Sequence, residues 1–129
     1  LGEGYGDIIN VGGAGTVAGL VYRLQTNGNW SLTDKDDEDQ IKNMIGVAMG
    51  TNSSNHGMLL RGFAQVSQSG QCTKGHKMYM GDTGIITGSV ADYSSNDIIR
   101  VVGYCLDAGE NNSSASIYFN PDNTFIQVA

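Results

Sequence analysis

Basic residues are scarce in this sequence. Its 129 residues include seven Lys and Arg against thirteen Asp and Glu, which gives a formal net charge of −6. Binding to nucleic acid depends on clustered Lys and Arg that neutralise phosphates, whereas the basic residues here are scattered between Arg23 and Arg100. The composition therefore argues against nucleic acid as a partner.

Long apolar runs are absent as well. No run approaches the roughly 18 residues that a transmembrane helix needs, and no signal-peptide pattern is visible. No window of about 12 residues keeps the apolar period of an amphipathic helix. We therefore expect neither membrane insertion nor a long helix. Because the sequence begins at Leu1 and not at Met, we expect a processed or partial chain.

Charged residues and proline are also few, whereas glycine is abundant. Charged residues make up 16% of the chain and there is one proline, against nineteen glycines; an average domain is about 25% charged. Short apolar runs separated by turn formers about every 8–12 residues are typical of an all-β chain. Asn27-Gly28 is a strong hairpin signal. The predicted strands are 17–25, 30–33, 44–49, 58–66, 76–80, 85–87, 98–106, 117–119 and 125–128.

We predict a small antiparallel β-barrel or β-sandwich of about nine to ten short strands. Residues 1–15 are interpreted as an extended Gly-rich arm that pairs with a neighbour or connects to a further segment, and residues 16–129 as a single β domain. The last three strands should form a meander, in which the turn at Pro121 delivers Phe125 to the core. The side chains expected in the core or at assembly contacts are Trp30, Leu60, Phe63, Val101, Tyr104, Phe119 and Phe125.

An acidic segment interrupts the strand pattern, and we expect a single helical turn near 34–42. The alternating oxygens from Asp34 to Gln40 resemble the start of a calcium loop, but Asp39 replaces the required glycine and Ile45 stands where a bidentate Glu belongs. A solvated acidic turn is the favoured interpretation, with a loose cation site as the alternative. We predict no metal centre.

Two glycine-rich stretches resemble phosphate-binding loops without fitting them. Gly13 begins a G-x-G-x-x-A run, but Gly19 interrupts the helix that such a loop needs. The stretch 70–77 has His76 where a P-loop needs lysine. No zinc-ligand spacing or nucleophile elbow is present. We therefore predict no cofactor and no catalytic residue.

Three polar loops, 52–56, 67–75 and 109–114, are expected to present hydrogen-bonding side chains on a rigid scaffold. Tyr93 is a further candidate that could stack on a sugar, although a packed or rim position is favoured for it. The candidate binding residues are Asn52, Asn55, His56, Gln71, Lys74, His76, Tyr93, Asn111 and Asn112.

The two cysteines leave two alternatives. Cys105 lies in a predicted apolar strand and Cys72 in a polar Gly-rich loop. A free buried thiol at Cys105 is the favoured expectation, and a disulfide between the two residues remains open.

Four segments of the sequence occur together in one order. They read VYRLQTNGNWSLTD from Val21, GVAMGT from Gly46 with GMLLRGF from Gly57, KMYMGDTGIIT from Lys77, and DIIRVVGY from Asp97 with IYFNPDNTFI from Ile117. In this order they resemble the C-terminal part of structural proteins of tailed bacteriophages, cyanophages especially. The likeness covers residues 18–128.

The resemblance implies a non-enzymatic virion component that is assembled in the host cytoplasm, where thiols stay reduced. It suggests a homotrimeric fibre-tip or fibre-like domain that presents polar loops for attachment. Its partners would be identical copies, other virion proteins and a host surface glycan or receptor. A capsid decoration (cement) protein is the alternative, which a Gly-rich arm at 1–15 would suit, and a polysaccharide-depolymerising fibre is a remote one.

Overall fold

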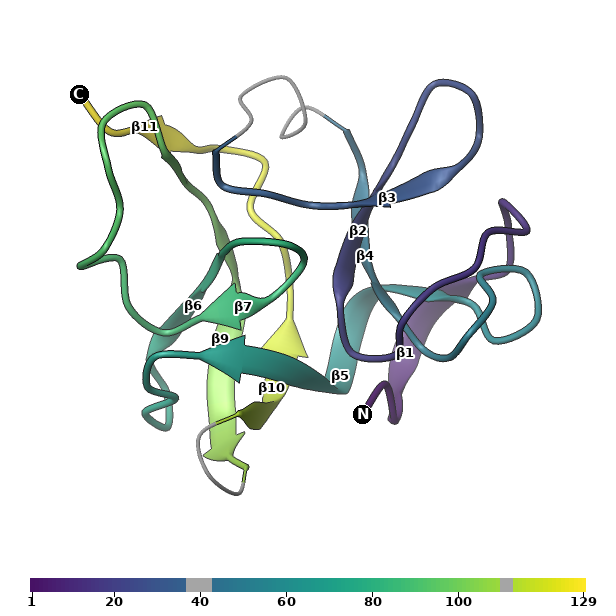
Figure 1. Ribbon diagram of the computed structural model, residues 1–129. Coiled ribbons are helices and arrows are strands. Elements are labelled where there is room, and N and C mark those ends of the chain that lie inside the picture. The colour runs from purple at the N-terminus through teal and green to yellow at the C-terminus, as the bar shows by residue number, and fades with distance from the viewer. Residues whose placement is uncertain (37–42, 110–112) are drawn as a thin grey trace.

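The computed structural model describes residues 1–36, 43–109 and 113–129, and the fold is all-β (Figure 1). The prediction of an all-β barrel with a Gly-rich N-terminal region is confirmed, with eleven strands in the described residues. The expected helical turn near 34–42 falls largely outside the described residues. The strands are β1 (Gly4–Ile9), β2 (Val21–Leu24), β3 (Trp30–Leu32), β4 (Ile45–Ala48), β5 (Met58–Ser69), β6 (Lys77–Met80), β7 (Ile86–Thr87), β8 (Ile98–Ile99), β9 (Val101–Ala108), β10 (Ser114–Phe119) and β11 (Ile126–Gln127).

Five strands close into a barrel in the order β5-β10-β9-β6-β7, with β7 returning to β5. The β5–β7 pairing is parallel, with Gln68 opposite Ile86, and the other four pairings are antiparallel. A ring with an odd number of strands cannot alternate direction all the way round, so one parallel pair is unavoidable. The sequence pattern predicts an antiparallel barrel. The barrel is antiparallel except for the β5–β7 pair.

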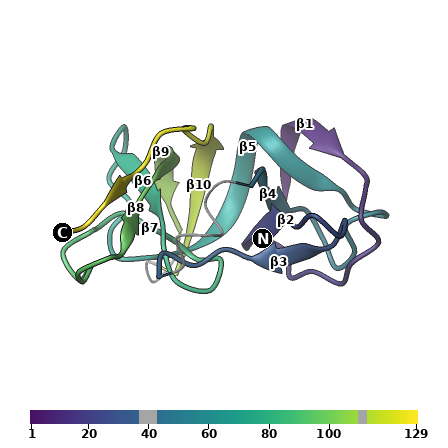
Figure 2. The same ribbon diagram turned by 90° about the horizontal axis from the view of Figure 1, so that it is seen from above.

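The twelve-residue strand β5 joins the barrel to a side sheet of β4, β2 and β3 (Figure 2). Along one edge β5 pairs first with β4, where Leu59 lies opposite Val47, and then with β10. Along its other edge it pairs with β1 and then with β7. The β1 register shifts between Arg61 and Leu59, which leaves Leu60 unpaired as a β-bulge. This bulge lets one strand bend between two sheets.

The hairpin of β2 and β3 forms at the predicted turn. The N–H of Gln25 donates to the carbonyl oxygen of Asn29 at 2.8 Å, and Gly28 has a φ of +89°. Trp30 begins β3 and is buried with Tyr22 in a small cluster on the side sheet.

The N-terminal segment does not reach outward as the predicted arm would. β1 pairs with β5 of the same chain, with Gly6 opposite Gly62. Gly62 has a φ of +140°, and a Cβ there would lie 2.4 Å from the carbonyl oxygen of Tyr5. Only glycine permits this backbone angle and this close approach, so the position fixes β1 against β5.

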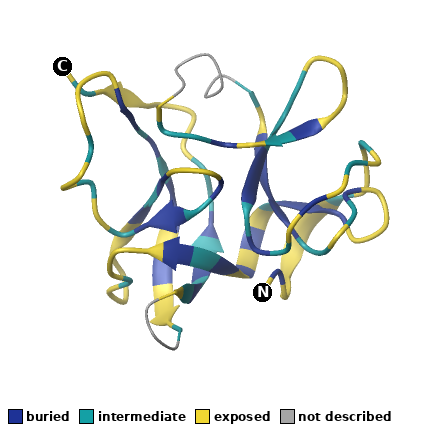
Figure 3. Ribbon diagram, in the orientation of Figure 1, coloured by how far each residue is buried: buried dark blue, intermediate teal, exposed yellow. Residues whose placement is uncertain are grey.

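Buried residues concentrate on the strands, as Figure 3 shows. The expectations for individual core residues are confirmed in part. Trp30 and Phe119 are buried, and Leu60 and Val101 are half-buried. The core assignment of three residues was wrong, because Phe63, Tyr104 and Phe125 are 41%, 39% and 36% exposed.

The physical reason for two of these errors is the alternation of side chains along a strand. Gly62 and Ala64 take the inward positions of β5, and Gly103 and Cys105 those of β9. The large side chains between them must then face outward. Phe125 instead precedes β11, which among the described strands pairs with the two-residue strand β8 and not with β10. The predicted meander therefore does not continue beyond β10, and Phe125 stays at the surface.

A partly buried cluster of ion pairs around Lys35 connects three segments of the chain. The ammonium of Lys35 lies 3.0 Å from Asp97 and 3.3 Å from both Asp36 and Asp82. The backbone N–H of Ser94 donates to the Asp97 carboxylate at 2.7 Å. This hydrogen bond is the main reason that the pKa of Asp97 is lowered, and Lys35 lowers it further. Burial alone would lower the pKa of Lys35, but its hydrogen bonds to Asp97, Asp36 and Asp82 raise it.

We expect Gly62→Ala to destabilise the fold by about 1–3 kcal/mol from the backbone angle alone, and by more from the contact with Tyr5. Urea unfolding measures the loss. Gly15→Ala is the matched control, because nothing lies within 4 Å of a Cβ there. Equal midpoints for the two variants would contradict the account of the β1–β5 crossing.

We expect Asp97→Asn to lower the free energy of unfolding by about 1.5–3 kcal/mol near neutral pH, because it removes a charged hydrogen-bond partner of the partly buried Lys35. The pKa of Asp97 is lower in the folded than in the unfolded chain. The contribution of Asp97 to the free energy of unfolding is therefore complete above about pH 4, near the pKa of the unfolded chain. It is lost as the pH falls through the lower pKa of the folded chain. Denaturant titrations from pH 7 down to acid should show a smaller pH dependence for Asp97→Asn than for the wild type or the exposed control Asp7→Asn.

Candidate functional site

A row of aromatic side chains crosses the outer face of four strands. Tyr5 of β1 pairs with Phe63 of β5, Phe63 with Tyr118 of β10, and Tyr118 with Tyr104 of β9. The ring centroids of Tyr5 and Phe63 are 5.2 Å apart, and those of Phe63 and Tyr118 are 5.5 Å apart. We call these four residues the aromatic row.

The neighbouring row of paired residues faces inward and explains the position of the aromatic row. It consists of Gly62, Phe119 and Gly103, which are buried on the barrel strands, and of Gly6 on β1, which continues the row outside the barrel and is exposed. Phe119 is fully buried, and the residues paired with it on both sides have no side chain. The barrel thus fills its interior with one ring from this row and leaves four on the outside.

The aromatic row is not covered by any described part of the chain. Tyr5 is 69% exposed, and Leu106 beside the row is 41% exposed. A shallow, mostly apolar groove of about 300 Å³ lies beside Tyr5 and Phe63 and is also lined by Glu3, Gln65 and Ser116. Exposed apolar patches of this kind mark sites of contact with another molecule.

A second, polar site lies where loop 70–76 faces loop 87–93. Three adjoining clefts of about 370, 510 and 280 Å³ follow one another there. The first two share His76 and Gly88, and the last two share Ser89 and Asp92. We call the three clefts together the loop groove.

The loop groove contains several of the predicted binding residues. Gln71 and His76 are exposed on its walls, and Tyr93 lines its last cleft. Tyr79 and Tyr104 line the first cleft, so Tyr104 belongs both to the groove and to the aromatic row. The predictions had not singled out Tyr79, whose place on the outer face of β6 follows only from the register.

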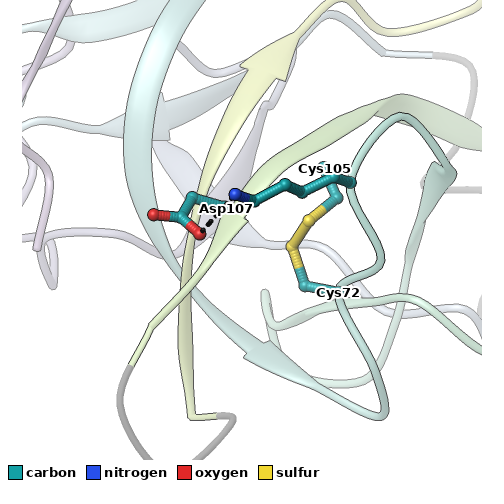
Figure 4. Close-up of a disulfide and its surroundings, with 4 residues drawn as sticks. Cys72, Cys105 and Asp107 are labelled. Atoms are coloured by element: carbon teal, nitrogen blue, oxygen red, sulfur yellow. Dashed lines mark ion pairs between the residues drawn. A yellow bond between two sulfur atoms is a disulfide. The ribbon is translucent and has the colours of Figure 1, made fainter.

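A disulfide fastens one wall of the groove to the barrel (Figure 4). Cys72 and Cys105 are bonded, with their Cα atoms 5.5 Å apart. The N–H of Gly75 donates to the carbonyl oxygen of Cys105 at 2.8 Å, and the N–H of Cys105 donates to that of His76 at 2.9 Å. The expectation of a free Cys105 thiol was therefore wrong, because the polar loop folds back onto β9.

Two lysines of this region are engaged in ion pairs. Lys74 lies on the outside of the loop, with its ammonium 3.7 Å from Asp107. Lys35 is held by its three carboxylates and lies 5.0 Å from the ring centre of Tyr93.

Tyr93 occupies the packed rim position that the sequence favoured. Its hydroxyl donates to the carbonyl oxygen of Met80, and its side chain is half-buried. Burial raises the pKa of Tyr93, against the smaller opposite effect of Lys35. The phenol therefore stays neutral and its ring is held in place.

The remaining predicted binding residues lie elsewhere. Loop 52–56 is at the opposite end of the molecule, next to the segment that follows β1 (Figure 1). There the side-chain oxygen of Asn52 accepts the N–H groups of Ser54 and Asn55 at 2.9 and 3.1 Å, which stabilises the turn. Asn55 and His56 are exposed at this end. Asn111 and Asn112 lie outside the described residues.

The acidic segment gathers carboxylates without making a clear cation site. Ligand oxygens of Asp34, Asp36 and Asp82 lie within 4.8 Å of one another. Lys35 already provides a positive charge to Asp36 and Asp82, which supports the favoured interpretation of a solvated acidic turn. Gln40, the last predicted oxygen donor, lies outside the described residues.

The fold and these two surfaces define an all-β barrel with an uncovered aromatic row and a loop-lined groove. Across residues 1–36, 43–109 and 113–129, no helix is long and apolar enough to cross a bilayer. No protein-family model, curated protein or solved structure matches this chain.

We expect reduction of the Cys72–Cys105 disulfide to lower the free energy of unfolding by about 3–4 kcal/mol, because the bond closes a loop with a sequence separation of 33. Urea unfolding with and without a reductant measures the difference. The variant with both cysteines changed to Ala is the control, since the reductant should leave it unaffected. A wild-type midpoint that does not move on complete reduction would contradict this expectation.

Proposed function

We propose that this chain is a non-enzymatic structural domain of a tailed-phage virion. In this role it is a homotrimeric fibre-tip or fibre-like domain that presents polar loops for attachment. The observation that carries the proposal is the uncovered aromatic row on a closed barrel. A barrel with a filled interior gains nothing by exposing Tyr5, Phe63 and Tyr104 around the half-buried Tyr118, unless another molecule covers them.

Identical copies are the partner that fits this surface best. The aromatic row ends at β1, which pairs only with β5 in the described part of the chain, so its outer edge can accept a strand from a neighbour. Each copy carries a charge of −6, so copies repel one another at long range. Association must therefore rest on apolar burial and edge pairing.

The attachment role is supported by the second surface. The loop groove lies on the rigid barrel and is held by a disulfide and backbone hydrogen bonds. Three copies on one tip would bind a repeated receptor with far higher avidity than one copy.

A cement role is less well supported than it was from the sequence. It rested on a Gly-rich arm that is free to order on a neighbouring subunit, whereas β1 is paired within its own chain. The number of copies per particle separates the two roles, since a fibre is present in a few copies and a cement protein in very many. The remote alternative, a depolymerising fibre, is addressed by incubating the protein with host polysaccharide and measuring cleavage.

We expect the isolated chain to sediment as a trimer at micromolar concentration, somewhat more tightly at high salt, because salt screens the repulsion between copies. Phe63→Ser should weaken association at least about tenfold, since Phe63 contacts both Tyr5 and Tyr118.

Val17→Ser is the matched control, because Val17 is 58% exposed but lies outside the aromatic row. Circular dichroism checks that both variants are folded. A wild-type monomer at both low and high salt would rule out a trimer that forms without other virion proteins.

A further inference from the structure

We infer that the loop groove is a binding site for a neutral oligosaccharide. This inference rests on the proposed attachment role and adds the chemical class of the ligand. It is argued from the shape of the groove, the chemistry of its walls, its charge and its rigidity.

The shape of the groove suits an extended ligand. The three clefts follow one another and share wall residues, and the largest is about 510 Å³. Ligand sites in proteins have volumes of about 300–1,000 Å³. A chain of two or three linked units would occupy the groove better than one compact molecule.

The walls combine two kinds of group that a sugar needs. Tyrosine rings at both ends, Tyr79 in the first cleft and Tyr93 in the last, offer apolar area with a polar tip. Between them Gln71, Ser89 and Asp92 supply hydrogen-bond donors and acceptors. A pyranose has C–H faces that pack on aromatic rings and hydroxyl groups that both donate and accept hydrogen bonds.

The charges of the groove disfavour an anionic ligand. Lys35 is held by Asp36, Asp82 and Asp97, and Lys74 is paired with Asp107. Lys77 contributes one further cation, whereas Asp82 and Asp92 both face the last cleft. Phosphate and nucleic acid need a surplus of positive charge, which these walls lack.

The groove is also rigid before any ligand binds. The 70–76 loop is tied to β9 by the Cys72–Cys105 disulfide and by two backbone hydrogen bonds. On its other side the loop rests on Gly88, where a Cβ would overlap the carbonyl oxygen of Gln71. A preorganised site loses little conformational entropy on binding, which matters for a ligand held by a few weak contacts.

The experiment uses the full chain and four probes, followed by NMR chemical-shift titration. The neutral probes are maltotetraose, cellotetraose and a mannotetraose, and the charged probe is an oligogalacturonate of the same length. We expect at least one neutral probe to bind with a Kd below about 10 mM, and the oligogalacturonate to bind more weakly. Gln71→Ala, an exposed and conservative truncation, should weaken that binding at least about fivefold, as should Tyr79→Ala.

Asn55→Ala, on the loop at the opposite end of the molecule, is the matched control and should leave the Kd unchanged. Reduction of the disulfide should weaken binding as well, since it releases one wall. Binding of none of the neutral probes, stronger binding of the charged probe, or a Kd unaffected by both groove variants would each overturn the inference.

The outcome is separable from that of the oligomerisation test. A monomer that binds a neutral probe through Gln71 would contradict the proposed trimer and support the sugar-binding site. A trimer that binds no neutral probe would support the proposed assembly and contradict the sugar-binding site.

Discussion

The fold depends on how β5 passes from one sheet to another. Its twelve residues serve four neighbouring strands, two along each edge, so that the barrel and the side sheet share one continuous backbone. Such sharing requires a bend, which the bulge at Leu60 supplies, and a close crossing with β1, which Gly62 allows. Without these two adjacent features the strand could remain in one sheet but not in both.

The same stretch of β5 also decides what the surface looks like. Side chains alternate strictly along a strand, so the residue that follows Gly62 has to point outward. The outward residues of this row are aromatic on all four strands, whereas the inward row of the barrel holds Phe119 on β10 between Gly62 and Gly103. Because the strands are held in register by backbone hydrogen bonds, the four rings cannot withdraw into the barrel. The uncovered row is thus a consequence of the packing around Phe119.

The sequence predicted the architecture better than it predicted the faces. Turn formers and β-branched runs located most strands, and Asn27-Gly28 located a hairpin, because these signals are local. Phe63 and Tyr104 were placed in the core because large aromatic residues are usually buried. The inward positions beside them are glycines, and a glycine in the sequence does not indicate that its position faces a core.

The prediction of the site was limited because contacts between segments far apart in the sequence leave no local signal. Gln71 and His76 were recognisable as polar loop residues, but nothing in the sequence places their loop against β9, so the disulfide was the less favoured alternative. The convergence of loop 70–76 with loop 87–93 likewise depends on closure of the barrel. Loop 52–56 has a similar composition, yet it lies at the other end of the molecule.

Closure of the ring by β10 also sets an order in which the chain can fold. Phe119 follows its partner Gly62 by 57 residues, whereas β1 and β4 precede β5 and are ready to pair as soon as β5 leaves the ribosome. At about 5–20 residues per second, the wait for β10 is on the order of 3–10 seconds. During that interval the nascent chain carries one unpaired strand edge beside the inward-facing side chains of Ala64 and Val66, which have no barrel to enclose them. Folding of this protein is therefore most exposed to error between the synthesis of β5 and that of β10, and the arrival of β10 ends that exposure.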